Sequence, residues 1–155
     1  MDEKHAKLIA AMVHYDKGDA KRIQHFLKVH KAAQFILETA AILHDIGIHV
    51  SEQKYGSSSG KYQEIEGPIE AQKLMEELGG YTEEQIERVK YLIGHHHTYK
   101  NIEGMDYQIL VEADFLVNIY EDEIKKDAVE YVKSNIFKTE SGKQLLTNMY
   151  IEELF

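Results

Sequence analysis

Residues 38–45 read ETAAILHD, and this stretch with its two flanks decides the fold. Ile36, Ala40 and Leu43 recur at helical spacing, so they form one apolar face of a helix. Gly47 follows at a place where glycine commonly ends a helix. We therefore expect an apolar helix that closes on a polar pair, the histidine and aspartate of its last two letters.

Similar helical patterns run through the whole chain of 155 residues. A single proline and little regular apolar alternation favour helices over strands. We expect an all-α protein, a single helical-bundle domain over residues 1–155 with about seven or eight helices. The pattern places helices at about residues 4–16, 106–120, 121–134 and 142–153, and another begins near residue 20.

Local signals mark several helix ends. Gly18 should stop the first helix and Asp19 should cap the second. Thr82 and Gln85 form a capping-box pattern. The helix after this box has an apolar stripe that leads directly into two histidines; its members, in order, are Ile86, Val89, Ile93, His96 and His97.

Residues 50–66 read VSEQKYGSSSGKYQEIE and lack a helical period. We expect a long loop here, and its Gly/Ser run at 56–60 could close over a substrate. Gly67 and Pro68 should then open the next helix, since proline suits a first helical turn. One more helix should follow, and Gly79 should end it.

Composition excludes several classes of protein. The chain has no cysteine, which excludes disulfides and thiolate metal sites and leaves a reducing cytoplasm as the expected compartment. No apolar run reaches the roughly 20 residues of a membrane span. The net charge of −9 argues against binding a nucleic acid duplex. A small anionic substrate remains compatible with it, because a bound metal cation can reverse the field inside one cleft.

Two acidic positions suggest a metal site. Asp114 lies on or beside an apolar helical stripe, where an ionised carboxylate is costly to bury unless it is paired or bound to a metal. The plain alternative is that Asp114 caps a helix or pairs with a lysine. His44 and Asp45 offer imidazole and carboxylate ligands, which suit transition metals. The plain alternative is that His44 and Asp45 are only a polar pair at the end of a helix.

Basic and histidine residues elsewhere could complete a phosphate site. Lys21 and Arg22 stand in a first helical turn, where cations oppose the helix dipole, so they are candidate phosphate contacts or simply a solvated basic turn. His25 follows on the same helix. The run at residues 95–97 is three histidines, which could hold a second metal or form a surface cluster, and Tyr99 could contact phosphate.

These pieces together resemble the HD superfamily of metal-dependent phosphohydrolases. Its signature is a histidine, then a His-Asp pair, then an aspartate, and the resemblance covers residues 19–122, two thirds of the chain. The matching words are HFLKV, AAILHDIG, EGPIEAQKLMEEL, IGHHHTY and VEADFLVNIYED. The resemblance implies a helical bundle whose metal ligands come from several helices.

The resemblance also implies roles for individual residues. The expected metal ligands are His25, His44, Asp45 and Asp114, of which His44 and Asp45 would be catalytic. A second ion would use His95, His96 and Glu64, and phosphate charge would be neutralised by Lys21, Arg22 and Lys61, with Tyr99 nearby. One divalent ion is expected and two are allowed for: Mn, Fe, Co, Ni or Zn, with Mg as an alternative.

Three departures from the family pattern matter. Hydrolases of guanosine tetraphosphate and deoxynucleotidases carry an acidic residue shortly after the His-Asp pair, whereas residues 46–49 here read IGIH, so these two branches are disfavoured. Dinuclear members usually have a histidine where this chain has Gln63, which puts a second metal in doubt. Only 18 residues separate His25 from His44, and a continuous helix would hold them about 28 Å apart. If both bind one ion, the chain must reverse near Lys31–Gln34.

The expected function is hydrolysis of a phosphomonoester or phosphodiester, with a nucleotide as the leading substrate. Two alternatives stay open. The chain could be an HD-fold regulatory module that binds a nucleotide without turnover, or a purely structural helical domain without metal.

Overall fold

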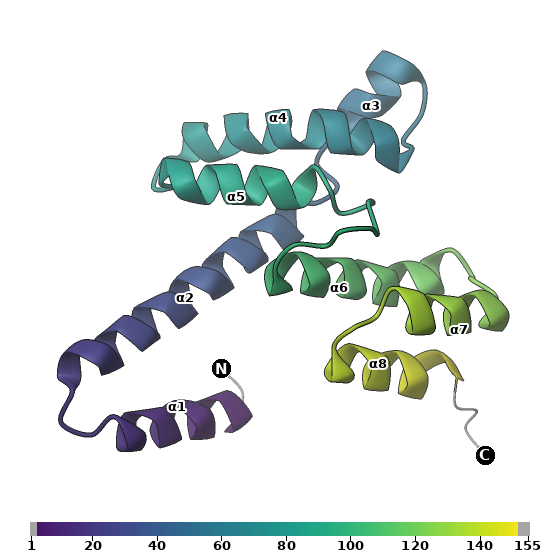
Figure 1. Cartoon of the computed structure of the whole chain (residues 1–155). Coiled ribbons are helices and arrows are strands. Elements are labelled where there is room, and N and C mark those ends of the chain that lie inside the picture. Colours follow the sequence, from purple (N-terminus) through teal and green to yellow (C-terminus); the bar gives the residue numbers. More distant parts are fainter. Residues whose placement is uncertain (1–2, 152–155) are drawn as a thin grey trace. The chain divides into compact units, whose positions relative to one another are not determined.

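The computed structural model describes residues 3–151, except for the side chains of residues 3–5, 29, 30 and 32. Every regular element in this range is a helix (Figure 1), so the expected all-α class is confirmed. None of these helices has the length and apolar content of a membrane span. The elements are α1 (Glu3–Tyr15), α2 (Ala20–Leu43), α3 (Ile48–Tyr55), α4 (Gly60–Leu78), α5 (Glu83–Ile93), α6 (Met105–Glu121), α7 (Lys126–Asn135), α8 (Glu140–Leu146) and the π-helical turn η1 (Thr147–Ile151).

The chain forms two compact units, Met1–Ile36 and Leu37–Phe155. The single domain over residues 1–155 stays a prediction. The described side chains of the first unit are all at least partly exposed, and the buried core belongs to the second. The second unit therefore has the apolar interior that a stable helical assembly requires.

The first unit contains α1 and the beginning of α2. Gly18 adopts a left-handed φ of +95° between the two helices, as its predicted role as a helix stop requires. Asp19 caps α2, since its Oδ1 accepts the backbone N–H of Arg22 at 2.9 Å. Both predicted helix ends are confirmed.

The reversal expected near Lys31–Gln34 is wrong. In the structure α2 continues as one helix from Ala20 to Leu43. The physical reason is local: the sequence KAAQFILETAA consists mostly of strong helix formers, and no glycine or proline interrupts it.

The long loop expected at residues 50–66 is also wrong. Most of this stretch forms α3 and the start of α4, and Pro68 lies inside α4 instead of opening it. Tertiary contacts hold these helices: Glu66 accepts hydrogen bonds from Lys54 Nζ at 2.6 Å and Tyr55 Oη at 2.7 Å. The ring of Tyr55 also stacks on Tyr62 at 4.2 Å. The two hydrogen bonds join residues 11 or 12 positions apart and the ring contact joins residues seven apart, so none of them produces a helical period in the sequence.

The core of the second unit extends from α4 and α5 through α6 to α7 and α8. α4 and α5 lie side by side (Figure 1), and α5 begins at the predicted capping box of Thr82 and Gln85. The predicted apolar stripe of α5 is buried. The most deeply buried core side chains include Ala71, Met75, Val89, Leu92, Ile93, Tyr107 and Val111.

α6 matches its predicted bounds closely but has two apolar faces. Tyr107 and Val111 enter the core. Leu110, Ala113 and Val117 share a face as predicted, but this face lines a hollow, and Val117 is 53% exposed. The last predicted helix, 142–153, corresponds to α8 and η1, and its final two residues lie outside the described range.

The start of α8 depends on a buried carboxylate from α6. Glu112 is 3% exposed and its Oε1 accepts the backbone N–H groups of Lys138 at 2.7 Å and Thr139 at 2.9 Å. Gln108 Nε2 also donates to Oε1, at 2.8 Å, and the other carboxylate oxygen accepts the Thr139 hydroxyl. An anion at a helix N-terminus is favoured by the helix dipole, so Glu112 fixes the C-terminal helices to α6.

We expect Glu112→Ala to lower the free energy of unfolding by about 3 kcal/mol, because it leaves several buried donors without an acceptor. Glu130→Ala, on the exposed face of α7, is the matched control and should change stability by less than about 0.5 kcal/mol. Urea unfolding followed by circular dichroism measures both. Equal stabilities for the two variants would contradict this role of Glu112.

Candidate metal centre

Close backbone packing positions the His-Asp pair. A Cβ on Gly47 would lie 2.7 Å from the backbone nitrogen of Gly67 in α4, so only glycine allows this approach. Gly67 in turn packs on Ile93, whose Cγ2 would lie 2.8 Å from a Cβ there. The chain after α2 is thereby held against α4, and α4 against the end of α5. His44 and Asp45 therefore come near the histidines that follow α5.

His44 faces two carboxylates. Its Nδ1 lies 2.8 Å from the carbonyl oxygen of Ala41, so this nitrogen carries a proton and donates. Its Nε2 lies 3.3 Å from Asp45 Oδ2 and 3.4 Å from Asp114 Oδ1. The side chain of Asp114 is only 9% exposed, as the sequence predicted for a carboxylate beside an apolar stripe.

His96 and His97 bring two further ring nitrogens to the same place. The Nδ1 of His96 lies 2.7 Å from the Ile93 carbonyl, and its Nε2 lies 3.6 Å from Asp45 Oδ1. His96 is fully buried, and the Nε2 atoms of both histidines are buried without a hydrogen-bond partner among the described residues. Ligand atoms of Asp45, His96 and His97 all lie within 4.8 Å of one another.

This arrangement fits a divalent metal. Buried polar atoms normally have a partner, and two orphaned imidazole nitrogens beside a carboxylate are the donor set that transition metals prefer. A backbone carbonyl that fixes the Nδ1 proton leaves Nε2 free to ligate, an arrangement common among metal-binding histidines. With 46% of its side chain exposed, Asp45 also leaves the cluster open to solvent and substrate.

Charges in the cluster are strongly coupled. Hydrogen bonds to Asp114 first and Asp45 second raise the pKa of His44 to about 10. The His44 ring, 3.3 Å away, and then the His96 ring, 3.6 Å away, hold the pKa of Asp45 well below its usual range. Burial lowers the pKa of His97, and the neighbouring His96 lowers it further. The two carboxylates thus attract positive charge, which either a protonated His44 or a metal cation provides.

The segment that carries these histidines is anchored from two sides. The hydroxyl of Tyr107 on α6 lies 2.6 Å from the carbonyl oxygen of His95 and also contacts that of Thr98. From α4, Glu64 accepts the backbone N–H of His97 and the Thr98 hydroxyl, both at 3.0 Å. These bonds fix the turn after α5, so the ring nitrogens keep their positions.

The structure brings together most of the predicted ligands. His44, Asp45 and Asp114, three of the four ligands predicted for the first ion, lie together. His96, which was predicted for a second ion, and His97, which was not predicted as a ligand, lie at the same place. The sequence prediction named His95 and His96 as ligands. The apolar stripe that leads to His96 and His97 was the signal that these two histidines face inward.

Two other predicted ligands of a second ion are used differently. His95 stacks on Tyr91 at 4.3 Å, its Nδ1 lies 2.7 Å from the Tyr91 carbonyl, and it is outside the ligand group found among the described residues. Glu64 is engaged in the turn described above. The side chain of Gln63 donates to the Ser58 carbonyl at 2.7 Å, and its own buried carbonyl oxygen has no partner in the described part of the chain.

The predicted phosphate contacts lie in separate places. Lys61 is exposed, with its Nζ 5.8 Å from the centre of the Tyr62 ring. Tyr99 packs on Phe115, and burial, with Asp114 and Glu64 nearby, raises its pKa to about 12.

The remaining candidates belong to the first unit. Arg22 pairs with Asp16 and Asp19, each at 3.5 Å, which gives this arginine a local role that needs no phosphate. Lys21 is exposed and the His25 ring lies 6.1 Å from Phe26. The contribution of His25 to the metal centre stays a prediction.

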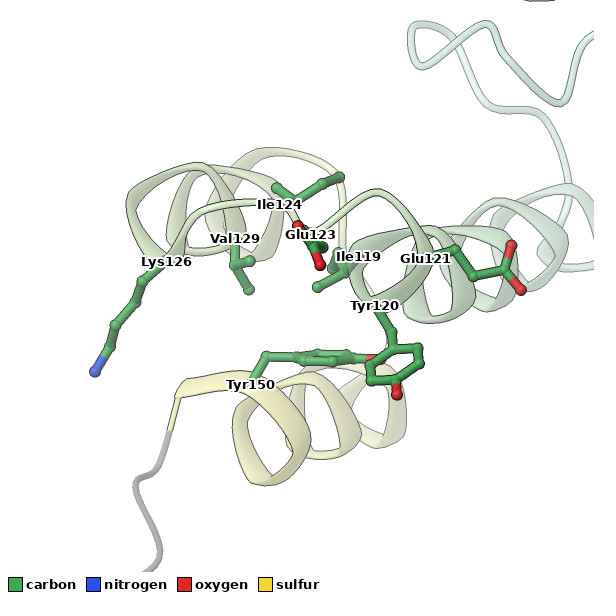
Figure 2. Close-up of a pocket in the computed structure, with 8 residues that line it drawn as sticks. All are labelled: Ile119, Tyr120, Glu121, Glu123, Ile124, Lys126, Val129 and Tyr150. Atoms are coloured by element: carbon green, nitrogen blue, oxygen red, sulfur yellow. The ribbon is translucent and has the colours of Figure 1, made fainter.

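A hollow of about 410 Å³ adjoins the cluster and includes His44, Asp45 and Asp114 in its wall. A larger hollow of about 490 Å³ lies between the end of α6, the start of α7 and η1 (Figure 2). The residues that line the larger one include no histidine and only one basic residue, Lys126. We place the candidate site at the smaller hollow because its wall contains the candidate ligands.

Comparisons with protein-family models, with curated proteins and with solved structures find no significant match for this chain. The candidate site therefore rests on the residues and geometry above.

The His44 ring should titrate near pH 10 in metal-free protein, far above its ordinary pKa of 6.5. Because the pKa is raised on folding, the stabilisation it reports is complete below about pH 6.5 and is lost as the pH rises through about 10. Asp114→Asn should lower the midpoint by roughly 1 to 3 units. The control Asp127→Asn, in the exposed first turn of α7, should not move it. NMR titration of the imidazole carbons measures all three, and an unshifted midpoint in Asp114→Asn would refute the contact.

Proposed function

We propose that this chain is a metal-dependent phosphohydrolase of the HD type, acting on a phosphomonoester or phosphodiester, with a nucleotide as the leading substrate. The observation that supports the proposal most directly is the pair of buried, unpartnered Nε2 atoms of His96 and His97 beside Asp45. The His-Asp pair and Asp114 meet at the same place, in agreement with the sequence resemblance.

The proposed ligands are His44, Asp45, Asp114, His96 and His97. A divalent ion held there would polarise a phosphoryl oxygen and lower the pKa of a water, as metals do in phosphate hydrolysis. The protein's own residues supply the geometry: the Ala41 carbonyl orients the His44 ring and the Ile93 carbonyl orients the His96 ring. Among these ligands Asp45 has the most exposed side chain, so the substrate would approach the ion on its side.

One observation favours a second candidate function, a regulatory module that binds a nucleotide without hydrolysing it. Gln63 stands where dinuclear relatives of the HD type would have a histidine, and an amide is a poor ligand for a second transition metal. Turnover of p-nitrophenyl phosphate and a nucleotide panel with added Mn or Co distinguishes the two functions. Tight nucleotide binding without product would favour the module. For either function we propose the cytoplasm as the location, since the chain has no cysteine to oxidise.

Replacing both His96 and His97 by glutamine should reduce the retained metal by at least about tenfold and abolish phosphoester hydrolysis. His49→Gln, an exposed histidine on α3, is the matched control and should retain both. Metal content after dialysis is measured by plasma mass spectrometry, with circular dichroism to check folding. A folded double variant that keeps its metal would remove the basis of this proposal, as would an Asp45→Ala variant that hydrolyses phosphoesters at the parent rate.

The proposed role of His25 needs its own test because it lies in the first unit. If His25 is a ligand, His25→Ala should weaken metal affinity by about tenfold or more. The control is His14→Ala, in the last turn of α1. Isothermal titration with Mn or Co measures both, and equal affinities would limit the metal centre to residues of the second unit.

A further inference from the structure

The hollow beside the candidate metal centre is lined by apolar and polar residues in addition to the candidate ligands. One part is apolar and is contributed by Ala41, Leu110, Ala113 and Val117. The other part is polar, and it consists of Asn118 and Glu121 near the C-terminal end of α6. No contact described so far assigns a role to either part.

The polar residues continue a row that begins at a candidate ligand. Asp114, Asn118 and Glu121 are spaced four and then three residues apart, so they share one face of α6. The helix rises about 10 Å over these seven residues. Glu121 lines both hollows, and Figure 2 shows its side chain extending away from the rings of Tyr120 and Tyr150, which line the larger one. A molecule with its phosphate at Asp114 would therefore extend along α6 toward Glu121.

The side chains of Asn118 and Glu121 determine which hydrogen-bonding groups the far end of that molecule must have. A carboxylate such as Glu121 only accepts hydrogen bonds, whereas the Asn118 amide both donates and accepts. The bound group near Glu121 must therefore be a hydrogen-bond donor, such as a hydroxyl or an amino group. Between it and the phosphate, the apolar wall favours an uncharged, flat or aliphatic body.

The charges of the hollow limit how many phosphates the molecule carries. Its lining residues include three carboxylates, Asp45, Asp114 and Glu121, and no lysine or arginine. One divalent cation offsets two of these negative charges, and the third remains at the far end. Additional phosphates usually need arginine, lysine or further metal ions as partners. The additional phosphates of a polyphosphate would be repelled by Glu121, and no lysine or arginine in the lining would offset their charge.

We propose that the substrate is a phosphomonoester with a single phosphate and an uncharged organic part that ends in hydrogen-bond donors, the class to which nucleoside monophosphates belong. Nucleoside di- and triphosphates are disfavoured. Glu121 and Asn118 determine this specificity. The inference rests on the proposed phosphohydrolase function and refines it.

The test compares four compounds with Mn-loaded full-length protein: p-nitrophenyl phosphate, AMP, ATP and the nucleoside adenosine. We expect kcat/KM for AMP to exceed that for ATP by at least tenfold. In Glu121→Lys this preference should shrink at least tenfold, because the new cation attracts the additional phosphates. In Asn118→Ala the ratio of kcat/KM for AMP to that for p-nitrophenyl phosphate should fall about tenfold. Equilibrium dialysis with adenosine, which needs no turnover, should show weaker binding in both variants.

The matched control is Glu77→Lys, which makes the same charge change at an exposed position of α4. It should keep the parent's preference for AMP over ATP. If p-nitrophenyl phosphate is hydrolysed but ATP is used as well as AMP, or if Glu121→Lys behaves like Glu77→Lys, this inference is overturned while the proposed function stands. If no phosphoester is hydrolysed with any metal, the proposed function falls and the inference with it.

Discussion

The backbone contact between Gly47 and Gly67 is the constraint on which the candidate site depends. No side chain separates the two backbones there, and in the next contact the Ile93 side chain packs on the backbone of Gly67, which joins α4 to the end of α5. Residues more than 40 positions apart in the sequence, the His-Asp pair and the histidine run, are thus placed beside each other. A helical bundle with ordinary side chains at these positions would hold them several ångströms further apart, because helices usually pack at 8–10 Å.

A second layer of contacts keeps the histidine turn rigid. Tyr107 from α6 and Glu64 from α4 bind its backbone, while the His44 and His96 rings are oriented by carbonyls of their own helices. Each ring therefore presents Nε2 toward the carboxylates without freedom to turn away. Such fixed orientation is what a metal site or a catalytic site requires, because misplaced ligands lose affinity and rate.

The cluster and the hollow beside it have complementary chemistry. Carboxylates and imidazoles at one end favour a cation and, through it, a phosphate. The apolar wall and the Asn118–Glu121 row at the other end favour a neutral body with hydrogen-bond donors. α6 contributes to both ends, and it also packs into the core through Tyr107 and Val111. α6 therefore contributes both to the stability of the second unit and to the wall of the candidate substrate site.

The sequence alone determined the helical class, the capping box at Thr82 and the cap at Asp19, and it singled out three of the residues that meet in the cluster, His44, Asp45 and Asp114. These are local matters, since propensity, caps and apolar spacing act over one or two helical turns. Tertiary structure decided that residues 48–55 and 60–66 are helical, because Glu66 and the stacked tyrosines hold them across distances without a periodic signal. It also selected His96 and His97 over His95. Adjacent residues point in different directions, and only the packing of α5 against α4 and α6 sets which of them face Asp45.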